Sequence, residues 1–179
     1  MKKIKNYLAE YVNINGTRQF LLHYKSTSVT NPVLLFIHGG PGMAESTFSY
    51  AFQEDLSTRY TVVRWDQRGA GKTLAKNKNC YPTMEELLHD MQAVVNYLKA
   101  KYAKEKIVIL GHSFGSLLGT MYTLRHPKDV LYYIGAGQFI SITENERVGY
   151  EKLKEIILES NHKADLKMLE KIGTYPESN

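Results

Sequence analysis

Short apolar runs alternate with amphipathic segments along most of the chain. Four runs, rich in β-branched and aromatic residues, are typical of buried strands: residues 33–37, 60–65, 107–110 and 130–134. Strands that alternate with helical segments predict an α/β fold built on a mostly parallel sheet. Ahead of them, residues 7–14 and 17–25 flank Asn15-Gly16, a dipeptide that favours a tight antiparallel hairpin because both positions accept positive φ.

Helical spacing is clearest in the segment that follows Pro82. Thr83 and Glu86 form a capping box, and the helix behind it has an apolar face made of Leu87, Leu88, Met91, Val94, Val95, Leu98 and Tyr102. A second helix follows Ser113 and ends before Pro127. A short helix is expected at residues 46–56 and a polar loop at residues 74–81.

The pattern changes after Gly135. A second capping box, Thr143 with Glu146, begins a highly charged stretch of purely helical pattern that continues to Gly173. We expect a helical hairpin outside the sheet. Residues 1–140 are therefore assigned to the α/β core and residues 141–179 to a separate helical part.

Composition narrows the possible functions. The chain has 179 residues, 43% of them hydrophobic, and a net charge of +5 without a long basic run, which argues against nucleic-acid binding. Its single cysteine, Cys80, excludes an intrachain disulfide and a cysteine-based metal site. No signal peptide or membrane-spanning run is visible, and no metal or other cofactor is indicated. We therefore expect a cytoplasmic protein without a membrane partner.

The candidate nucleophile is Ser113, in Gly111-His112-Ser113-Phe114-Gly115. This Gly-x-Ser-x-Gly pattern stands between a buried strand and a helix, which is the context of a nucleophile elbow. Gly111 and Gly115 allow the sharp turn to close, and the helix N-terminus favours developing negative charge. The alternative is an ordinary N-cap serine.

A second glycine-rich loop, His38-Gly39-Gly40-Pro41-Gly42, follows the strand at residues 33–37. Acyl transfer needs two N–H donors for the oxyanion of the tetrahedral intermediate. We assign them to the amides of Gly40 and Phe114, with Gly39 in reserve; the alternative is a tight turn without a catalytic amide. His38 is interpreted as a residue that orients the loop, because the base of this arrangement comes after the serine.

The third loop contains Asp66-Gln67-Arg68-Gly69. We expect a buried Asp66–Arg68 pair that supports the turn beneath the nucleophile; direct contact of Arg68 with substrate is the alternative. Residues 69–73 match the end of a phosphate-binding P-loop, but Asp66 replaces its first glycine and a loop is expected after Thr73. Nucleotide binding is thus a weaker hypothesis.

These three motifs, in this order, resemble the prolyl iminopeptidase branch of the α/β-hydrolase fold. The likeness covers roughly residues 5–140 and implies a Ser–Asp–His hydrolase with a helical cap after the sixth strand, which residues 141–179 would begin. His112 and Phe114 stand where that branch has Gly and Trp. Its amine-binding acidic residues have no match here, since Glu144, Glu146 and Glu151 are interpreted as surface charges. An esterase, amidase or other aminopeptidase therefore remains an alternative to proline specificity.

The acid and base of such a triad are not recognised in this chain. After Ser113 the candidates are His126, Asp129, His162 and Asp165, and only Asp129 with His162 has the right order. We interpret the chain as the N-terminal part of a longer serine hydrolase that acts on a small ester, an amide or a short peptide. The alternative is an inert, truncated hydrolase fold that serves as an interaction or scaffold protein, with self-association through an exposed sheet edge.

Overall fold

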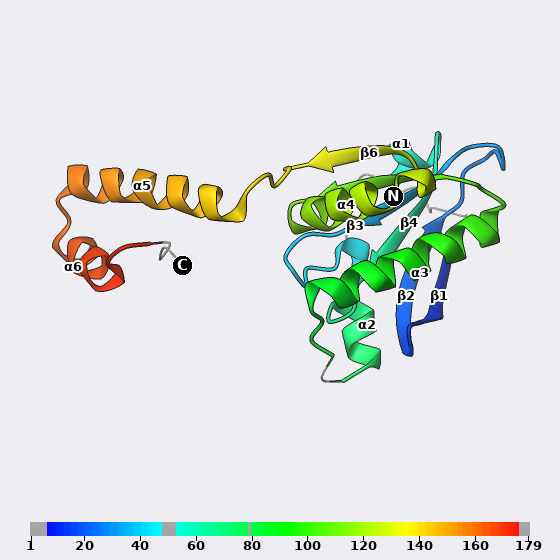
Figure 1. The fold of residues 1–179 in the computed structure, drawn as a ribbon, viewed down its shortest axis with the longest axis horizontal. Helices are drawn as coiled ribbons and strands as arrows, with labels where there is room; N and C mark the ends of the chain where they lie inside the picture. The colour runs from blue at the N-terminus through cyan, green and yellow to red at the C-terminus, as the bar shows by residue number, and fades with distance from the viewer. Residues whose placement is uncertain (1–6, 48–52, 79, 176–179) are drawn as a thin grey trace. The chain divides into compact units, whose positions relative to one another are not determined.

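A computed structural model describes residues 7–47, 53–78 and 80–175, and Figure 1 shows its ribbon. The chain divides into two compact units, residues 1–138 and 139–179. Among the described residues, the first unit contains six strands: β1 (Tyr7–Ile14), β2 (Thr17–Tyr24), β3 (Val33–Ile37), β4 (Thr61–Asp66), β5 (Ile107–His112) and β6 (Val130–Ala136). Its helical elements are η1 (Glu45–Thr47), α1 (Gln53–Ser57), α2 (Gly71–Lys76), α3 (Met84–Tyr102), α4 (Phe114–Arg125) and η3 (Pro127–Asp129).

The strands form one mixed sheet in the order β1-β2-β4-β3-β5-β6. β1 and β2 pair antiparallel around Asn15 and Gly16, which have φ 46° and φ 80°, and β2 continues antiparallel against β4. The pairs β4–β3, β3–β5 and β5–β6 are parallel. The expected fold class, a mostly parallel α/β sheet with an N-terminal antiparallel hairpin, is confirmed.

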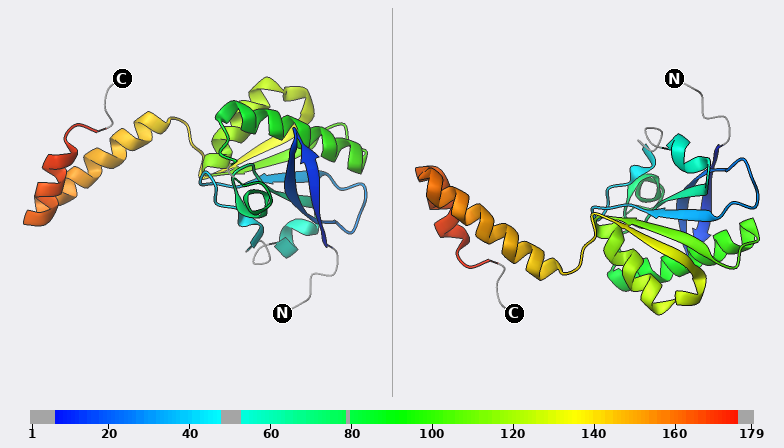
Figure 2. Two further views of the ribbon diagram at one scale, coloured as in Figure 1. Left: turned by 90° about the horizontal axis from the view of Figure 1, so that it is seen from below. Right: turned by 90° about the horizontal axis from the view of Figure 1, so that it is seen from above.

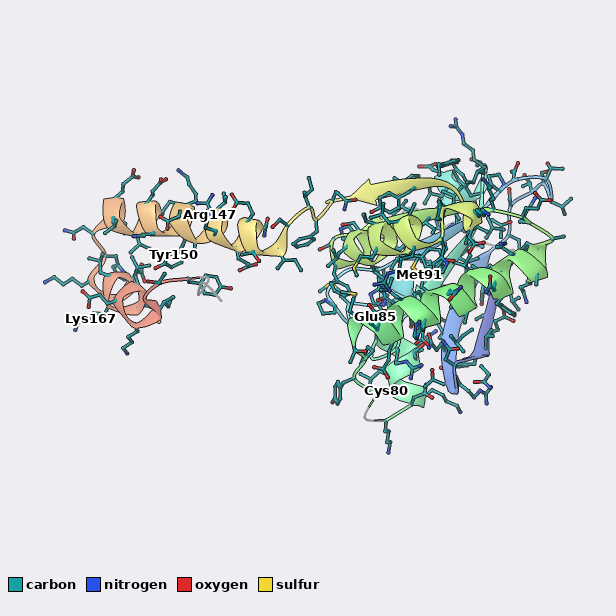
Figure 3. All side chains as sticks on the ribbon, in the orientation of Figure 1. Cys80, Glu85, Met91, Arg147, Tyr150 and Lys167 are labelled. Atoms are coloured by element: carbon teal, nitrogen blue, oxygen red, sulfur yellow. The ribbon has the colours of Figure 1, made fainter. Side chains whose placement is uncertain are left out.

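Both faces of the sheet are covered, as the continuous apolar runs predicted. α3 and α4 pack on one face, where Met91 lies fully buried among alternate residues of β3 and β5 (Figures 2 and 3). The opposite face has a smaller apolar cluster that includes Leu34, Phe36 and Val108. Because strand residues alternate between the two faces, both clusters hold the same central strands in place.

β6 is an edge strand of the sheet within the described residues. Two of its apolar side chains are exposed, Leu131 by 50% and Tyr132 by 42%. Such an edge can pair with another strand, so self-association through it stays a prediction.

Most expected elements of the first unit are present, including the capping box of Thr83 and Glu86 at the start of α3. The loop expected at residues 74–81 is wrong over its first three residues, because α2 extends to Lys76. Asp66 explains the difference: its carboxylate accepts the N–H of Lys72 at 2.9 Å, and its carbonyl accepts the hydroxyl of Thr73 at 2.5 Å. Part of the helix expected at residues 46–56 lies outside the described residues.

The second unit is a helical hairpin of α5 (Ile142–Ser160) and α6 (Lys163–Ile172), as the pattern predicted. The expected capping box at Thr143 is wrong. The N-cap is Ser141, two residues before Thr143, and the helix begins at Ile142. The Ser141 side chain accepts the N–H of Glu144 at 3.2 Å. The assignment of this hairpin to a cap stays a prediction.

Candidate active site

Ser113 stands between the end of β5 and the start of α4. Its backbone has φ 52° and ψ −122°, a conformation that costs a residue other than glycine about 1–3 kcal/mol. Its N–H donates to the carbonyl of Ala136 on β6 at 2.9 Å, and its own carbonyl accepts the N–H of Ser116 at 2.8 Å. Ser113 holds the N-cap position of α4, but within the described chain its side chain makes no capping hydrogen bond. The sharp strand-to-helix turn expected at Ser113 is therefore present, and its role as a nucleophile stays a prediction.

The glycine-rich loop after β3 lies directly against this elbow. A Cβ atom added to Gly39 would lie 3.0 Å from the Cβ of Ser113 and 3.2 Å from the carbonyl oxygen of His112. A larger residue at position 39 would force the neighbouring atoms to move by a few tenths of an ångström, so this close approach favours glycine. The next residue, Gly40, has φ 112°, so the turn also depends on a conformation that other residues avoid. The structure thus brings the loop and the serine together, as two converging motifs require.

His38 is buried and connects two of the three loops. Its Nδ1 lies 2.9 Å from the carbonyl oxygen of Gly39, and its Nε2 lies 3.2 Å from the backbone N–H of Gln67. The Gln67 side chain in turn donates to the His38 carbonyl at 3.0 Å. Burial lowers the pKa of His38, so the ring is neutral near pH 7, with Nδ1 donating and Nε2 accepting. These contacts are those of a residue that orients the loop.

The expected ion pair between Asp66 and Arg68 is not formed. Arg68 instead donates from Nε and NH2 to the two carboxylate oxygens of Asp90 on α3, at 2.7 and 2.9 Å. The hydrogen bond to Asp90 raises the pKa of Arg68. Asp66 binds the N-terminus of α2 through Lys72, so that amide is already engaged by a carboxylate and is not available to a phosphate. Arg68 therefore ties its loop to α3.

The residue before Ser113, His112, contacts two residues that the sequence analysis did not identify, Glu45 directly and Arg64 through Glu45. Nδ1 of His112 lies 2.6 Å from Glu45 Oε1, and NH1 of Arg64 lies 3.6 Å from the other carboxylate oxygen. Glu45 and Arg64 are buried, whereas the His112 side chain is 48% exposed. Burial lowers the pKa of Arg64 to about 10, so it remains a cation near pH 7. The group fastens η1, which follows the glycine-rich loop, to the residue before Ser113.

The candidate acids and bases after Ser113 each have a partner in their own unit. Asp129 accepts hydrogen bonds from Lys99 at 2.5 Å and from Tyr122 at 3.0 Å. Asp129 precedes β6 and Ser113 follows β5; because these two strands are parallel, the two residues lie at opposite edges of the sheet. The ring of His126 packs on Tyr122. In the second unit, Nδ1 of His162 lies 2.9 Å from Asp165.

Within residues 7–47, 53–78 and 80–175, no helix combines the length and apolarity needed to cross a membrane. In the same residues, no group of three or more His, Cys, Asp or Glu side chains is placed so that it could hold a metal ion.

Comparison with known proteins shows the family to which the chain belongs. The alpha/beta hydrolase fold family matches residues 32–170. The probable aminopeptidase YbaC of Bacillus subtilis is 34% identical over 147 residues, which cover 81% of this chain and 46% of that protein. A putative proline iminopeptidase of Mycoplasma pneumoniae is 35% identical over 96 residues, 54% of this chain and 29% of that protein.

A solved structure supports the fold independently. The proline iminopeptidase-related protein of Thermus thermophilus superposes with a TM-score of 0.58 at 24% identity, over 73% of this chain and 44% of that one. The chain thus spans less than half the length of each of these three proteins. The resemblance to the prolyl iminopeptidase branch is confirmed, and the chain belongs to the alpha/beta hydrolase fold family.

Proposed function

We propose that this chain supplies the nucleophile and oxyanion hole of a serine hydrolase that cleaves an ester, an amide or a short peptide, in the manner of a prolyl iminopeptidase-like aminopeptidase. The observation that carries the proposal is the strained backbone of Ser113 with the Gly39 loop packed against its Cβ. Backbone strain persists only where the surroundings impose it, and it concentrates at functional sites. Two relatives, a probable aminopeptidase and a putative proline iminopeptidase, support peptides as substrates.

In the proposed mechanism, the Oγ of Ser113 attacks the carbonyl carbon of the substrate. The carbonyl oxygen becomes an oxyanion, which accepts hydrogen bonds from the amides of Gly40 and Phe114. The Phe114 amide is the first of α4, so the helix dipole also favours the negative charge. Loss of one such donor typically lowers the rate about 10²–10³-fold.

The attack needs a base to take the proton of Ser113, and the base needs an acid to orient it. We propose that both lie outside these 179 residues. Asp129 is engaged by Lys99 in the first unit, and His162 is engaged by Asp165 in the second. The chain alone should then turn over substrate very slowly, since loss of triad members lowers kcat by about 10⁴–10⁶.

The test compares this chain with the product of the complete reading frame of its gene, using an acyl ester and proline anilide. The longer protein should hydrolyse at least one of them, and Ser113→Ala should remove the activity. The matched control is Ser160→Ala, which changes an exposed serine at the end of α5. Equal rates for Ser113→Ala and the unmodified protein would exclude Ser113 as the nucleophile.

A further inference from the structure

A cavity of about 400 Å³ lies at the edge of the sheet where the parallel strands begin. It is lined by Val33 and Thr61, which start β3 and β4, and by Lys101 and Tyr102 at the end of α3. Ser113 follows the end of β5, and because β3, β4 and β5 are parallel it belongs to the other edge of the sheet. The volume is within the usual range of small-molecule sites. The cavity is therefore separate from the candidate active site.

The charge of the lining has one sign. Among the described residues that line the cavity, three are lysines and none is an aspartate or a glutamate. The Nζ of Lys104 donates to the carbonyl oxygens of Val29 and Thr30, at 2.9 and 3.1 Å, and these neutral partners leave its charge uncompensated. Lys25 is exposed, and no side chain in the described part of the chain pairs with it. The cavity thus has an excess of positive charge that attracts an anion.

The buried side chain of His23 shows that two of these charges act on one place. Its Nδ1 lies 2.9 Å from the hydroxyl of Tyr102, which lines the cavity. Burial lowers the pKa of His23 to about 4, and Glu10 opposes that effect. The positive charges of Lys101 and Lys25 lower it further. Lys101 pairs with Glu10 at 3.2 Å, but Glu10 does not line the cavity, so the positive charge inside it persists.

Much of the remaining lining is apolar. The apolar surface comes from Val29, Val33, Ala103 and the ring of Tyr102. A hydroxyl adds to the polar side, since Ser26 accepts a hydrogen bond from Asn31 at 2.7 Å and its own O–H can still donate. Ammonium groups and a hydroxyl beside an apolar wall suit a ligand that has one charged end and one apolar end.

We propose that this cavity binds a small organic anion in which a carboxylate is attached to an apolar ring or chain. The carboxylate faces Lys25 and Lys104, and the apolar group covers Val33 and the ring of Tyr102. The proposal is independent of the chemistry at Ser113.

The test measures binding to this chain by NMR titration at low ionic strength, followed through the methyl resonances of Val29 and Val33. Benzoate should bind about ten-fold more tightly than benzamide, which has the same ring without the charge, since three ammonium groups contribute. It should also bind about ten-fold more tightly than acetate, which has the charge without a ring to bury. Added salt should weaken the benzoate complex and leave the benzamide complex unchanged.

Charge variants of Lys25 locate the site, because this exposed side chain can be replaced without disturbing the core. Lys25→Glu should weaken the benzoate complex about five-fold or more, whereas Lys25→Arg keeps the charge and should stay within about two-fold of the unmodified chain. The matched control is Lys76→Glu, which makes the same change of net charge at an exposed lysine of α2 and should leave the affinity unchanged.

Equal affinities for benzoate and benzamide, or for benzoate and acetate, would overturn the proposal. Methyl resonances of Val29 and Val33 that do not move with benzoate would do the same. An equal loss of affinity in Lys25→Glu and Lys76→Glu would also overturn it, because the chain would then respond only to its net charge.

Discussion

The first unit of the chain is stabilised by a buried core, whereas the helices of the second unit have no buried residue in their described part. In the first, the central strands are buried on both faces, and residues such as Leu35 and Ile109 have no exposed surface. In the described part of the second, neither helix has a buried residue, and Val148, Leu153 and Ile156 are each about half exposed. Figure 3 labels Arg147, Tyr150 and Lys167 on these helices.

The difference indicates where strained backbone geometry can be maintained. The elbow at Ser113 is fixed by β5, α4, β6 and the glycine-rich loop together. The helices of the second unit depend on local features, such as the Ser141 cap and the i,i+3 pair of Glu144 with Arg147. Isolated helices shorter than about 12–15 residues are marginal in water, so the 10-residue α6 depends on packing that local features do not supply.

The largest expected contrast comes from the same substitution in the two units. Gly115→Ala would place a Cβ 2.6 Å from the carbonyl oxygen of His38, so α4 would have to move away from β3. We expect a loss of about 4 kcal/mol or more in the free energy of unfolding, measured by chemical denaturation. Gly149→Ala, in the middle of α5 with nothing within 4 Å, should instead stabilise its helix by about 0.5–1 kcal/mol. Similar small effects at both positions would contradict the contrast.

A smaller contrast is expected between two ion pairs. Asp90 is fully buried and accepts hydrogen bonds from Arg68, Gln19 and Asn15, so Asp90→Ala removes all three bonds and leaves the Arg68 cation, whose side chain is 13% exposed, without its carboxylate. It should lower the free energy of unfolding by about 3–5 kcal/mol. Glu144→Ala breaks an exposed pair in the second unit and should produce no measurable change in a thermal melt. Comparable melting temperatures for the two variants would show that the Asp90 network is not needed for stability.

Acid should affect the first unit through His23, a fully buried side chain. Burial lowers its pKa to about 4, from about 6.5 in an unfolded chain, although Glu10 lies 2.9 Å away. Between these values the unfolded state binds the proton and the folded state does not. The free energy of unfolding should therefore fall as the pH decreases from about 6.5 to 4, by about 1–3 kcal/mol. His23→Asn should flatten this part of the pH profile, and an unchanged slope would exclude His23 as its source.

Much of the first unit could be predicted because its signals are local. The Asn15-Gly16 hairpin, the Thr83 capping box and the elbow at Ser113 each depend on a few neighbouring residues. The sheet followed from apolar runs long enough to be buried on both faces. The sequence also allowed the proximity of Ser113 and Gly39 to be predicted. The loops that carry them follow β3 and β5, and loops at the carboxyl ends of adjacent parallel strands meet at one edge of the sheet.

The remaining features depend on contacts that local patterns do not encode. The partner of Arg68 is Asp90, 22 residues away, and not the nearer Asp66. The contact of His112 with Glu45 spans 67 residues. Carboxylates on an amphipathic helix usually face solvent, so nothing in the pattern of α3 indicated that Asp90 would be buried.

The most direct test of the central claim is the detection of an acyl group on Ser113. The product of the complete reading frame would be mixed with a slowly hydrolysed acyl ester, quenched in acid, and examined by intact-protein and peptide mass spectrometry. A covalent mechanism predicts one transient acyl adduct, on the peptide that contains Ser113, and none in Ser113→Ala. Hydrolysis of the ester with an adduct at another residue, or with an adduct that persists in Ser113→Ala, would contradict it.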